Sequence, residues 1–553
     1  MRATAVLVLL LNFALVSAWY YGRPDPGLMT KGGVWPLPWK VVYQNKTHIL
    51  DPTKFEFTSD VKNCEILNSA FKRYKKLVFT GPIMEQPPTL NSIQVSIKGG
   101  CDSKAYPKMG MDESYKLTIP VESDSSALLE ANEIWGVLRG LETFSQLVYR
   151  DGYSLYLLSA ANIEDHPRFP HRAVMIDSVR HFLPVQMILR NIDLMAQNKY
   201  NVLHWHLTDS EAFPYESKKF PQMARKGAYT QNHIHSRKDI ARVIEFARLR
   251  GIRVIAEFDT PGHTGAWGKG RPGLLSKCFS TNPKRPMLEN IIDPSKEENF
   301  EFLKGFFQEA LETFPDNYIH LGGDEVGGLM HDCWLRNPRV RKWMQDNGYG
   351  DDVSAVLKMY LSKLVNIIQS SRNGTNMIFW QEVLDMNVAP KNTIAHVWKG
   401  DTVAEIMQEM HDVTANGHYA ILSSCWYLNY IKYGADWGYV NAEHLRQRGL
   451  YYQCDPTGFN GTEAQKKLVL GGETVMFGEF VDSTNLIPRL WPRASAPAER
   501  LWSDPEQTKS ADEAWPRLHE HRCRMLDRGY PVQPPNNPDY CPRFWNPDYP
   551  DLD

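Results

Sequence analysis

Short apolar segments alternate with helical ones throughout the chain after residue 170, and this alternation restricts the fold more than any other feature. Amphipathic segments at residues 184–198, 238–250 and 297–314 lie between the apolar runs. Such an order predicts an α/β protein, a closed (β/α)8 TIM barrel. A doubly wound open sheet is the alternative, but no G-x-G-x-x-G motif or P-loop favours it. The expected barrel strands are residues 173–178, 201–210, 251–260, 318–325, 376–383, 393–398, 419–427 and 474–482.

Polar and aromatic residues gather where these expected strands end. The ends read SVRH, HLTDS, EFDTPGH, GGDE, WQEV, VWK, WYLN and GEFVD. In a (β/α)8 barrel the carboxyl ends of the strands build the active site. Carboxylates, histidines and tryptophans concentrated at these positions therefore predict an enzyme.

The chain before the barrel reads as two further parts. Residues 1–18 have a positive end, a short apolar run and a small-residue cleavage site, as in a secretory signal peptide. Residues 19–165 are expected to form a smaller α+β domain, with strands at 92–98 and 115–121 and one long helix at 127–148. Two prolines, Pro167 and Pro170, mark the boundary. Residues 166–553 then form the catalytic barrel with a C-terminal extension.

Composition excludes some classes of partner. The net charge is −2 and no basic block occurs, so nucleic acid is not an expected partner. No run after the signal peptide is long and apolar enough to span a membrane.

The eight cysteines have no C-x-x-C spacing, which favours disulfides over zinc. Glycosylation sequons at Asn45, Asn373 and Asn460 agree with a lysosomal or secreted protein.

The segment HLGGDEV, residues 320–326, carries the strongest chemical signal. Two glycines let another group approach the backbone, and two adjacent acids, Asp324 and Glu325, follow them. Adjacent acids at the floor of a pocket repel one another, which raises the proton affinity of one. A protonated acid beside an ionised carboxylate is the arrangement that general acid catalysis needs. A solvated acid pair in a loop is the alternative.

A second motif, NVLHWHLTDS at residues 201–210, suggests a rival chemistry. His204 and His206 share one face of the expected strand, and with His263 and an acid they could bind a metal for hydrolysis. The position on the second strand and the intervening Trp205 favour packing instead. No metal and no cofactor are therefore expected.

Aromatic residues and two arginines complete the set of candidates. Each aromatic residue alone would be read as core, but several at one rim suggest a box around a flat apolar group. Arg172 and Arg180 flank the first barrel strand, where an arginine is either structural or positioned to hold vicinal hydroxyls. The aromatic candidates are Trp380, Trp398, Trp426, Tyr427 and Phe477.

With these residues assembled, the chain resembles glycoside hydrolase family 20, the β-N-acetylhexosaminidases, and among them the lysosomal hexosaminidase subunits of animals. The resemblance runs from about Pro36 to Arg543. It includes the segments WGVLRGLETFSQL, FPHRAVMIDSVRHF, NVLHWHLTDS, EFDTPGH, HLGGDEV, WQEV, ILSSCWYLN and RLWPRASAPAERLW.

The resemblance implies substrate-assisted hydrolysis of terminal β-linked N-acetylglucosamine or N-acetylgalactosamine, with retention of configuration. Glu325 is then the general acid, and the acetamido carbonyl of the substrate is the nucleophile. Asp324 orients the acetamido N–H, and Tyr427 binds the acetamido oxygen. A pH optimum below neutrality is expected.

The other roles that the resemblance implies concern binding. The resemblance implies that Trp380 and Trp398 are two walls of the acetamido box. It implies that Arg172 binds the 3- and 4-hydroxyls and that Glu479 binds the 4-hydroxyl. Asp209 and His263 are implied to form a polar pair behind the acid.

Two positions depart from the family pattern. Phe477 stands where the third wall is usually Trp, which removes area and an indole N–H. At the position of Asn429, one animal subunit type has Asp, and the other has Asn followed by Arg. Here Asn429 is followed by Tyr430. Neutral sugars are therefore the expected substrates, with anionic ones tolerated weakly.

The family pattern also implies disulfides and an oligomer. The implied pairs are Cys64–Cys101, Cys278–Cys333 and Cys523–Cys541, while Cys425 and Cys454 either form a fourth bond or stay free. A homodimer acting on a glycan substrate is expected. The remaining alternatives are a non-catalytic glycan-binding protein on the same fold, the metal-dependent hydrolase using His204 and His206, and an endo-acting chitinase.

Overall fold

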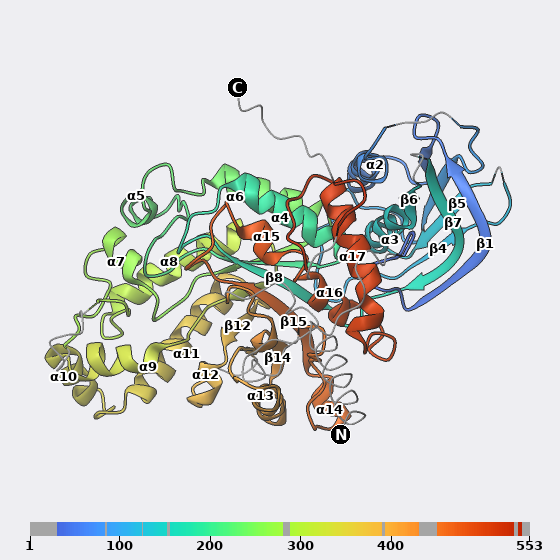
Figure 1. Ribbon diagram of the computed structural model, residues 1–553. Coiled ribbons are helices and arrows are strands. Elements are labelled where there is room, and N and C mark those ends of the chain that lie inside the picture. Colours follow the sequence, from blue (N-terminus) through green and yellow to red (C-terminus); the bar gives the residue numbers. More distant parts are fainter. Residues whose placement is uncertain are drawn as a thin grey trace, which may run out of the picture.

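The computed structural model consists of a closed barrel and a smaller N-terminal domain (Figure 1). It describes residues 30–82, 86–123, 125–151, 155–279, 288–389, 393–430, 451–535 and 540–544. The expected signal peptide, residues 1–18, lies outside the described residues. Within the described ranges, no helix combines the length and the apolar character that crossing a membrane requires.

The N-terminal domain is a mixed sheet of seven strands, of which six follow the order β1-β7-β4-β5-β3-β2 and β6 pairs with β7. Every residue of α3 is buried. Figure 1 shows this helix on the barrel side of the sheet, so the helix is covered by the sheet on one side and by the barrel on the other. The strands are β1 Lys40–Leu50, β2 Glu56–Ser59, β3 Ser92–Ile97, β4 Tyr115–Ile119, β5 Ala127–Ala131, β6 Val148–Arg150 and β7 Tyr156–Asp165, and the helices are α2 Glu65–Val78 and α3 Ile134–Leu147.

The expected helix at residues 127–148 is wrong over its first part. Ala127–Ala131 forms strand β5, which pairs in parallel with β3 and antiparallel with β4. Its residues alternate between buried and more exposed positions, and the helix begins only at Ile134. Alanine, leucine and glutamate favour helices, but pairing between two strands outweighs this local preference.

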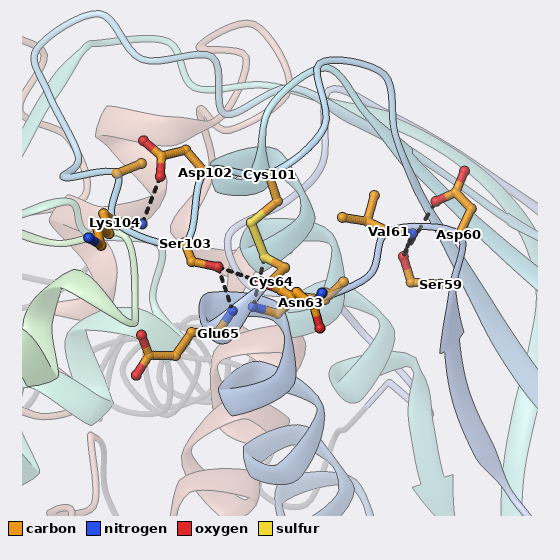
Figure 2. Close-up of a disulfide and its surroundings, with 12 residues drawn as sticks. Ser59, Asp60, Val61, Asn63, Cys64, Glu65, Cys101, Asp102, Ser103 and Lys104 are labelled. Atoms are coloured by element: carbon orange, nitrogen blue, oxygen red, sulfur yellow. Dashed lines mark hydrogen bonds between the residues drawn. A yellow bond between two sulfur atoms is a disulfide. The ribbon is translucent and has the colours of Figure 1, made fainter.

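A disulfide holds the start of α2. The sulfur of Cys64 accepts a hydrogen bond from the Leu67 amide and forms a disulfide with the sulfur of Cys101 (Figure 2). Next to it, the Ser103 hydroxyl donates to the Asn63 carbonyl and accepts from the Glu65 amide. The bond therefore joins the N-terminus of the helix to the loop that follows β3.

The barrel closes in the order β10-β11-β12-β13-β14-β15-β8-β9, and its neighbouring strands are parallel. The expected (β/α)8 fold is confirmed. The strands are β8 His171–Asp177, β9 Val202–His206, β10 Arg253–Glu257, β11 Tyr318–His320, β12 Asn376–Trp380, β13 Ile394–Val397, β14 Tyr419–Leu422 and β15 Val469–Met476.

The last strand begins five residues before its expected start at Thr474. Gly471 and Gly472 belong to β15, although two consecutive glycines usually mark a turn or loop rather than a strand. A Cβ atom on Gly471, whose φ is 144°, would lie 1.9 Å from the His171 carbonyl oxygen. Glycine is required here because β15 and β8 approach each other so closely.

Helices surround the barrel and extend it at its C-terminal end (Figure 1). They are α4 Val185–Gln197, α5 Gln222–Gly227, α6 Arg237–Arg248, α7 Gly265–Gly270, α8 Glu297–Thr313, α9 Val326–Leu329, the π-helix η1 Met330–Leu335, α10 Pro338–Asp346, α11 Val353–Ser371, α12 Glu382–Asp385, α13 Val403–Ala415, the 3₁₀ turn η2 Ser424–Trp426, α14 Glu463–Lys466, α15 Leu486–Leu490, α16 Ser495–Trp502 and α17 Ala511–Asp527.

Buried ion pairs join the two domains. Asp165, the last residue of β7, pairs with Lys199 of the barrel at 2.8 Å, and both side chains are fully buried. Asp165 also accepts a hydrogen bond from the indole of Trp502. The C-terminal helix α17 lies between the domains in Figure 1, where Arg528 pairs with Glu142 of α3.

All eight cysteines are in disulfides: Cys64–Cys101, Cys278–Cys333, Cys425–Cys454 and Cys523–Cys541. The three expected pairs are confirmed, and the open question about Cys425 and Cys454 resolves as a fourth bond. The asparagines of the three sequons, Asn45, Asn373 and Asn460, are all exposed.

Candidate active site

A cavity of about 520 Å³ opens at the carboxyl ends of the barrel strands. It brings together every residue expected at the catalytic and substrate-binding site except Arg172. The lining residues are Arg180, His206, Asp209, Asp259, His263, Asp324, Glu325, Trp380, Trp398, Tyr427, Asn429, Tyr430, Phe477, Glu479 and Phe480.

Two glycines carry the chain from β11 into this cavity. Gly322 has a φ of 68°, and a Cβ atom on it would lie 1.7 Å from Oδ1 of Asp259. The next amide, of Gly323, donates to the same oxygen at 2.8 Å. Asp324 and Glu325 follow directly, and Glu325 itself has a left-handed φ of 52°. Such a conformation is unfavourable for glutamate and is held only where the surroundings impose it.

The two adjacent acids have different surroundings. The Asp324 side chain is 15 % exposed and that of Glu325 is 62 % exposed. Burial raises the pKa of Asp324, whereas a hydrogen bond with His263 lowers the pKa of Glu325. The expectation that pairing raises one pKa holds for Asp324, but burial is the main cause and repulsion from Glu325 is a minor one. In the free site, burial therefore favours a proton on Asp324, whereas His263 disfavours one on Glu325.

Asp259 is a third acid in the same pocket, and sequence reasoning gave it no role. Burial and the charge of Asp324 raise the pKa of Asp259 well above its usual value. Asp259, His263 and Asp324 each bring one side-chain oxygen or nitrogen to within 4.8 Å of the other two. The segment EFDTPGH contains Asp259, so its position at a strand end was an available signal.

A polar pair lies behind Glu325. His263 Nδ1 is 3.0 Å from Oδ1 of Asp209, and His263 Nε2 is 3.5 Å from Oε2 of Glu325. Burial opposes charge on His263, but the negative charges of Asp209 and Asp324 raise its pKa well above the usual value. His263 is therefore a cation that can donate a hydrogen bond to Glu325.

Four aromatic rings form one side of the cavity. Phe477 lies between Trp380 and Tyr427, with ring centroids 6.2 Å and 5.9 Å away, and Tyr427 is 6.2 Å from Trp398. Both indole N–H groups are anchored on carboxylates: Trp380 donates to Glu257 and Trp398 to Glu382, each at 2.8 Å. Phe477 has no such donor and needs no acceptor. Trp426 is fully buried in the core and does not line the cavity.

Arg172 lies away from the cavity, which corrects the expectation that it binds substrate hydroxyls. Its guanidinium is fully buried, pairs with Glu113 at 2.6 Å and donates to the Phe169 and Lys199 carbonyls. The arginine of the cavity is Arg180, which follows β8. It pairs with Asp209 at 2.7 Å and Asp177 at 3.1 Å. Arg172 stands near the amino end of β8, whereas barrel active sites lie at the carboxyl ends.

The outer part of the cavity is less enclosed. Asn429 and Glu479 line it, as expected, together with Tyr430 and Phe480. Phe480 is 72 % and Tyr430 43 % exposed. The GEFVD segment carries both Glu479 and Phe480, but an aromatic residue beside a polar one gave no indication that Phe480 would face the cavity.

In the part of the chain that the structure describes, histidine and carboxylate atoms approach one another closely enough to surround a cation in three places. These are His204 with Glu257 and His320, His204 with His396 and Glu473, and Asp259 with His263 and Asp324. In the barrel interior, His204 Nδ1 is 2.5 Å from Glu473 and its Nε2 is 3.0 Å from Glu257. His206 lies likewise between Glu257 and Asp209. Both ring nitrogens of His204 and both of His206 thus contact carboxylates, which does not favour the hypothesis of a metal-dependent hydrolase.

Comparison with known proteins agrees with this site. A family model described as the catalytic domain of glycosyl hydrolase family 20 matches residues 169–505, and one described as beta-acetyl hexosaminidase like matches residues 34–147. Beta-hexosaminidase A of Caenorhabditis briggsae is 48 % identical over 542 residues, covering 97 % of each chain.

Two further proteins extend the comparison. The human beta-hexosaminidase subunit beta is 43 % identical over 546 residues, covering 96 % of this chain and 94 % of that one. The structure of a Flavobacterium johnsoniae chitobiase has a TM-score of 0.75 at 26 % identity, covering 91 % of this chain and 74 % of that one. The matched domains span both parts of the fold and include the whole cavity, and the chain belongs to glycosyl hydrolase family 20.

Proposed function

We propose that the protein is an exo-acting β-N-acetylhexosaminidase that removes terminal β-linked N-acetylglucosamine and N-acetylgalactosamine with retention of configuration. The observation that carries this proposal is the meeting of Asp324 and Glu325 with an aromatic box in one cavity. An acid, a carboxylate and a box for an acetamido group are what substrate-assisted hydrolysis requires.

In the proposed reaction, Glu325 gives its proton to the glycosidic oxygen as the bond from that oxygen to the anomeric carbon breaks. The acetamido carbonyl oxygen of the same sugar bonds to the anomeric carbon and forms an oxazolinium ion. Asp324 accepts a hydrogen bond from the acetamido N–H and stabilises its developing positive charge. Tyr427 donates a hydrogen bond to the acetamido oxygen. A water molecule then gives a proton to Glu325 and its oxygen to the anomeric carbon, which opens the ring.

Substrate binding would bring the two acids into the states that this reaction needs. Covering Glu325 with the sugars on either side of the bond removes water and raises its pKa. An amide N–H donated to Asp324 stabilises the ionised form and lowers its pKa. Binding would therefore shift each pKa in the direction opposite to its shift in the free site.

The remaining lining residues are proposed to bind the sugar. Arg180 takes the role expected of Arg172, because its guanidinium is fixed by Asp177 and Asp209 at the cavity wall. Glu479 would accept from the 4-hydroxyl. Asn429 would face the 6-position without the charge of an aspartate, and with Tyr430 beside it neutral sugars remain the proposed substrates.

Processing, location and assembly are proposed from sequence. Cleavage of a signal peptide after residue 18 and glycosylation at the exposed Asn45, Asn373 and Asn460 would place a glycoprotein in the lysosome or outside the cell. A homodimer is proposed from the resemblance alone.

The test compares 4-nitrophenyl β-glycosides of N-acetylglucosamine, N-acetylgalactosamine and glucose on the wild-type protein. Turnover of the first two, with monosaccharide as the initial product, is expected, whereas the glucoside lacks the nucleophile and should be inert. Glu325→Gln should lower kcat by about 10²–10⁴. Equal hydrolysis of the glucoside, or binding without turnover, would reject the proposal in favour of another hydrolase or a glycan-binding protein.

A further inference from the structure

Glu257, at the end of β10, contacts groups from three other barrel strands, β9, β11 and β12, although it does not line the cavity. Its side chain is fully buried. Oε1 accepts from the indole N–H of Trp380 at 2.8 Å and lies 3.2 Å from His320 Nδ1. Oε2 is 2.6 Å from His206 Nδ1 and 3.0 Å from His204 Nε2.

One oxygen of Glu257 fixes a wall of the aromatic box. Trp380 is 2 % exposed, so its indole N–H has no bulk water to turn to if the carboxylate is removed. The ring is also stacked on His396, with centroids 4.1 Å apart. Stacking sets the plane of the indole, while the hydrogen bond sets its rotation within that plane.

The other oxygen begins a chain of contacts that leads to the acid. His206 joins Glu257 through Nδ1 to Asp209 Oδ2 through Nε2, at 2.6 Å and 2.8 Å. Asp209 Oδ1 then meets His263 Nδ1 at 3.0 Å, and His263 Nε2 lies 3.5 Å from Glu325. Each ring in this chain uses both of its nitrogens, so the orientation of one group determines that of the next.

We propose that Glu257 is a positioning residue that sets both halves of the catalytic site at once, the Trp380 wall through Oε1 and the Glu325 acid through His206, Asp209 and His263. It touches neither the substrate nor the reacting atoms. This inference rests on the proposed function of the same cavity.

The charges around Glu257 agree with this role. Burial raises its pKa, but the charge of His206 and the hydrogen bond with His204 outweigh burial and hold the pKa well below the usual value. The charge of Glu257 in turn raises the pKa of His206 well above normal, against the effect of burial. Glu257 is therefore an anion, and His206 is a cation that donates from both nitrogens. Glutamine could supply only one acceptor oxygen and no charge, so it could not serve both sides.

The experiment separates the two halves by kinetics and binding. The acid half is read from the ratio of kcat/KM for 4-nitrophenyl and methyl β-N-acetylglucosaminides, because a poor leaving group depends more on proton donation. The box half is read from the calorimetric Kd of a thiazoline analogue of the oxazolinium ion. Trp380→Phe should weaken thiazoline binding alone, and Asp209→Asn should mainly widen the leaving-group ratio.

Glu257→Gln is expected to do both, with about tenfold weaker thiazoline binding and about a tenfold wider leaving-group ratio. The matched control is His171→Gln, a fully buried barrel histidine that meets Glu473 at 3.5 Å. It should lower Tm but leave both readouts unchanged. If Glu257→Gln changes only one readout, or neither beyond the control, the inference is wrong.

A second measurement does not depend on the folding of Glu257→Gln. His206→Gln and Trp380→Phe remove one partner from each oxygen of Glu257, so their effects on kcat/KM should be non-additive in the double variant. Additive effects would overturn the inference. A wild-type protein that neither binds the thiazoline nor hydrolyses the aryl substrate would instead overturn the proposed function.

Discussion

The carboxylates of Asp324 and Glu325 are adjacent in sequence but differ in surroundings, since the first is 15 % and the second 62 % exposed. The free site thus holds a buried carboxyl of raised pKa beside an accessible one of lowered pKa. The proposed reaction needs a proton on Glu325 and an ionised Asp324, so both shifts must change direction when substrate binds. The pH dependence of the enzyme should therefore differ between its free and substrate-bound forms.

The alkaline limb of kcat should lie at higher pH than that of kcat/KM. The limb of kcat/KM reports Glu325 in the free enzyme, where His263 lowers its pKa, and the limb of kcat reports Glu325 covered by substrate. Because activity needs the protonated acid, a higher pKa moves the limb upward. Initial rates with an aryl N-acetylglucosaminide from pH 3 to 8 would check this, and coincident limbs would contradict it. An optimum below neutrality remains the expectation.

His263→Asn should move the alkaline limb of kcat/KM to higher pH while lowering kcat. His263 lowers the pKa of Glu325 by a hydrogen bond and by its charge, and both are lost in the variant. Glu325 then keeps its proton to higher pH. His411→Asn, on α13, is the control and should not move the limb. A downward shift in His263→Asn would show that another group determines the limb.

Phe477→Trp should make the site more selective for the N-acetyl group. Phe477 lies between Trp380 and Tyr427, so a larger ring narrows the box. We expect the ratio of kcat/KM for N-acetyl over N-butanoyl aryl glucosaminides to rise about tenfold. Phe480→Trp, at the exposed rim, provides the comparison and should leave the ratio unchanged. An unchanged ratio in Phe477→Trp would mean that this ring does not limit the box.

Removing the Cys425–Cys454 bond should impair both stability and activity. Cys425 precedes Tyr427 by two residues, and the bond closes a separation of 29 residues. Replacing both cysteines by serine should cost about 3–4 kcal/mol of unfolding free energy and lower kcat. The same change at Cys64 and Cys101, in the N-terminal domain, should lower Tm and spare kcat. Equal kcat losses in the two variants would indicate a general effect of destabilisation.

Arg172→Met and Arg180→Met should differ in what they damage. Arg172→Met removes a buried partner of Glu113 and should cost about 3–5 kcal/mol of stability, with little change in KM for the folded protein. Arg180→Met should raise KM and lower kcat/KM, because Arg180 lines the cavity. Thermal unfolding and steady-state kinetics measure both quantities. Loss of substrate binding in Arg172→Met at unchanged stability would restore the role first expected of it.

The sequence predicts the barrel well because strand and helix periodicities differ and repeat. It also predicts the acid pair, since GGDE at the end of a buried strand has few structural explanations. It fails at Ala127–Ala131, where strand pairing outweighs helix propensity. The prediction that Arg172 binds substrate is also wrong. Arg172 lies near the amino end of β8, whereas the active site lies at the carboxyl ends of the strands. The directions in which the pKa values of Asp324 and Glu325 shift depend on burial and on His263, and neither is visible in a local motif.

The salt links of Asp165 with Lys199 and of Glu113 with Arg172 bear on how this enzyme can be engineered. A shortened chain that begins at the barrel would leave two cations on a former interface without their counter-ions. Such a fragment should be less stable than the whole chain, because breaking a buried ion pair by removing one partner is costly. Chimeras between relatives should exchange the N-terminal domain only together with these four positions.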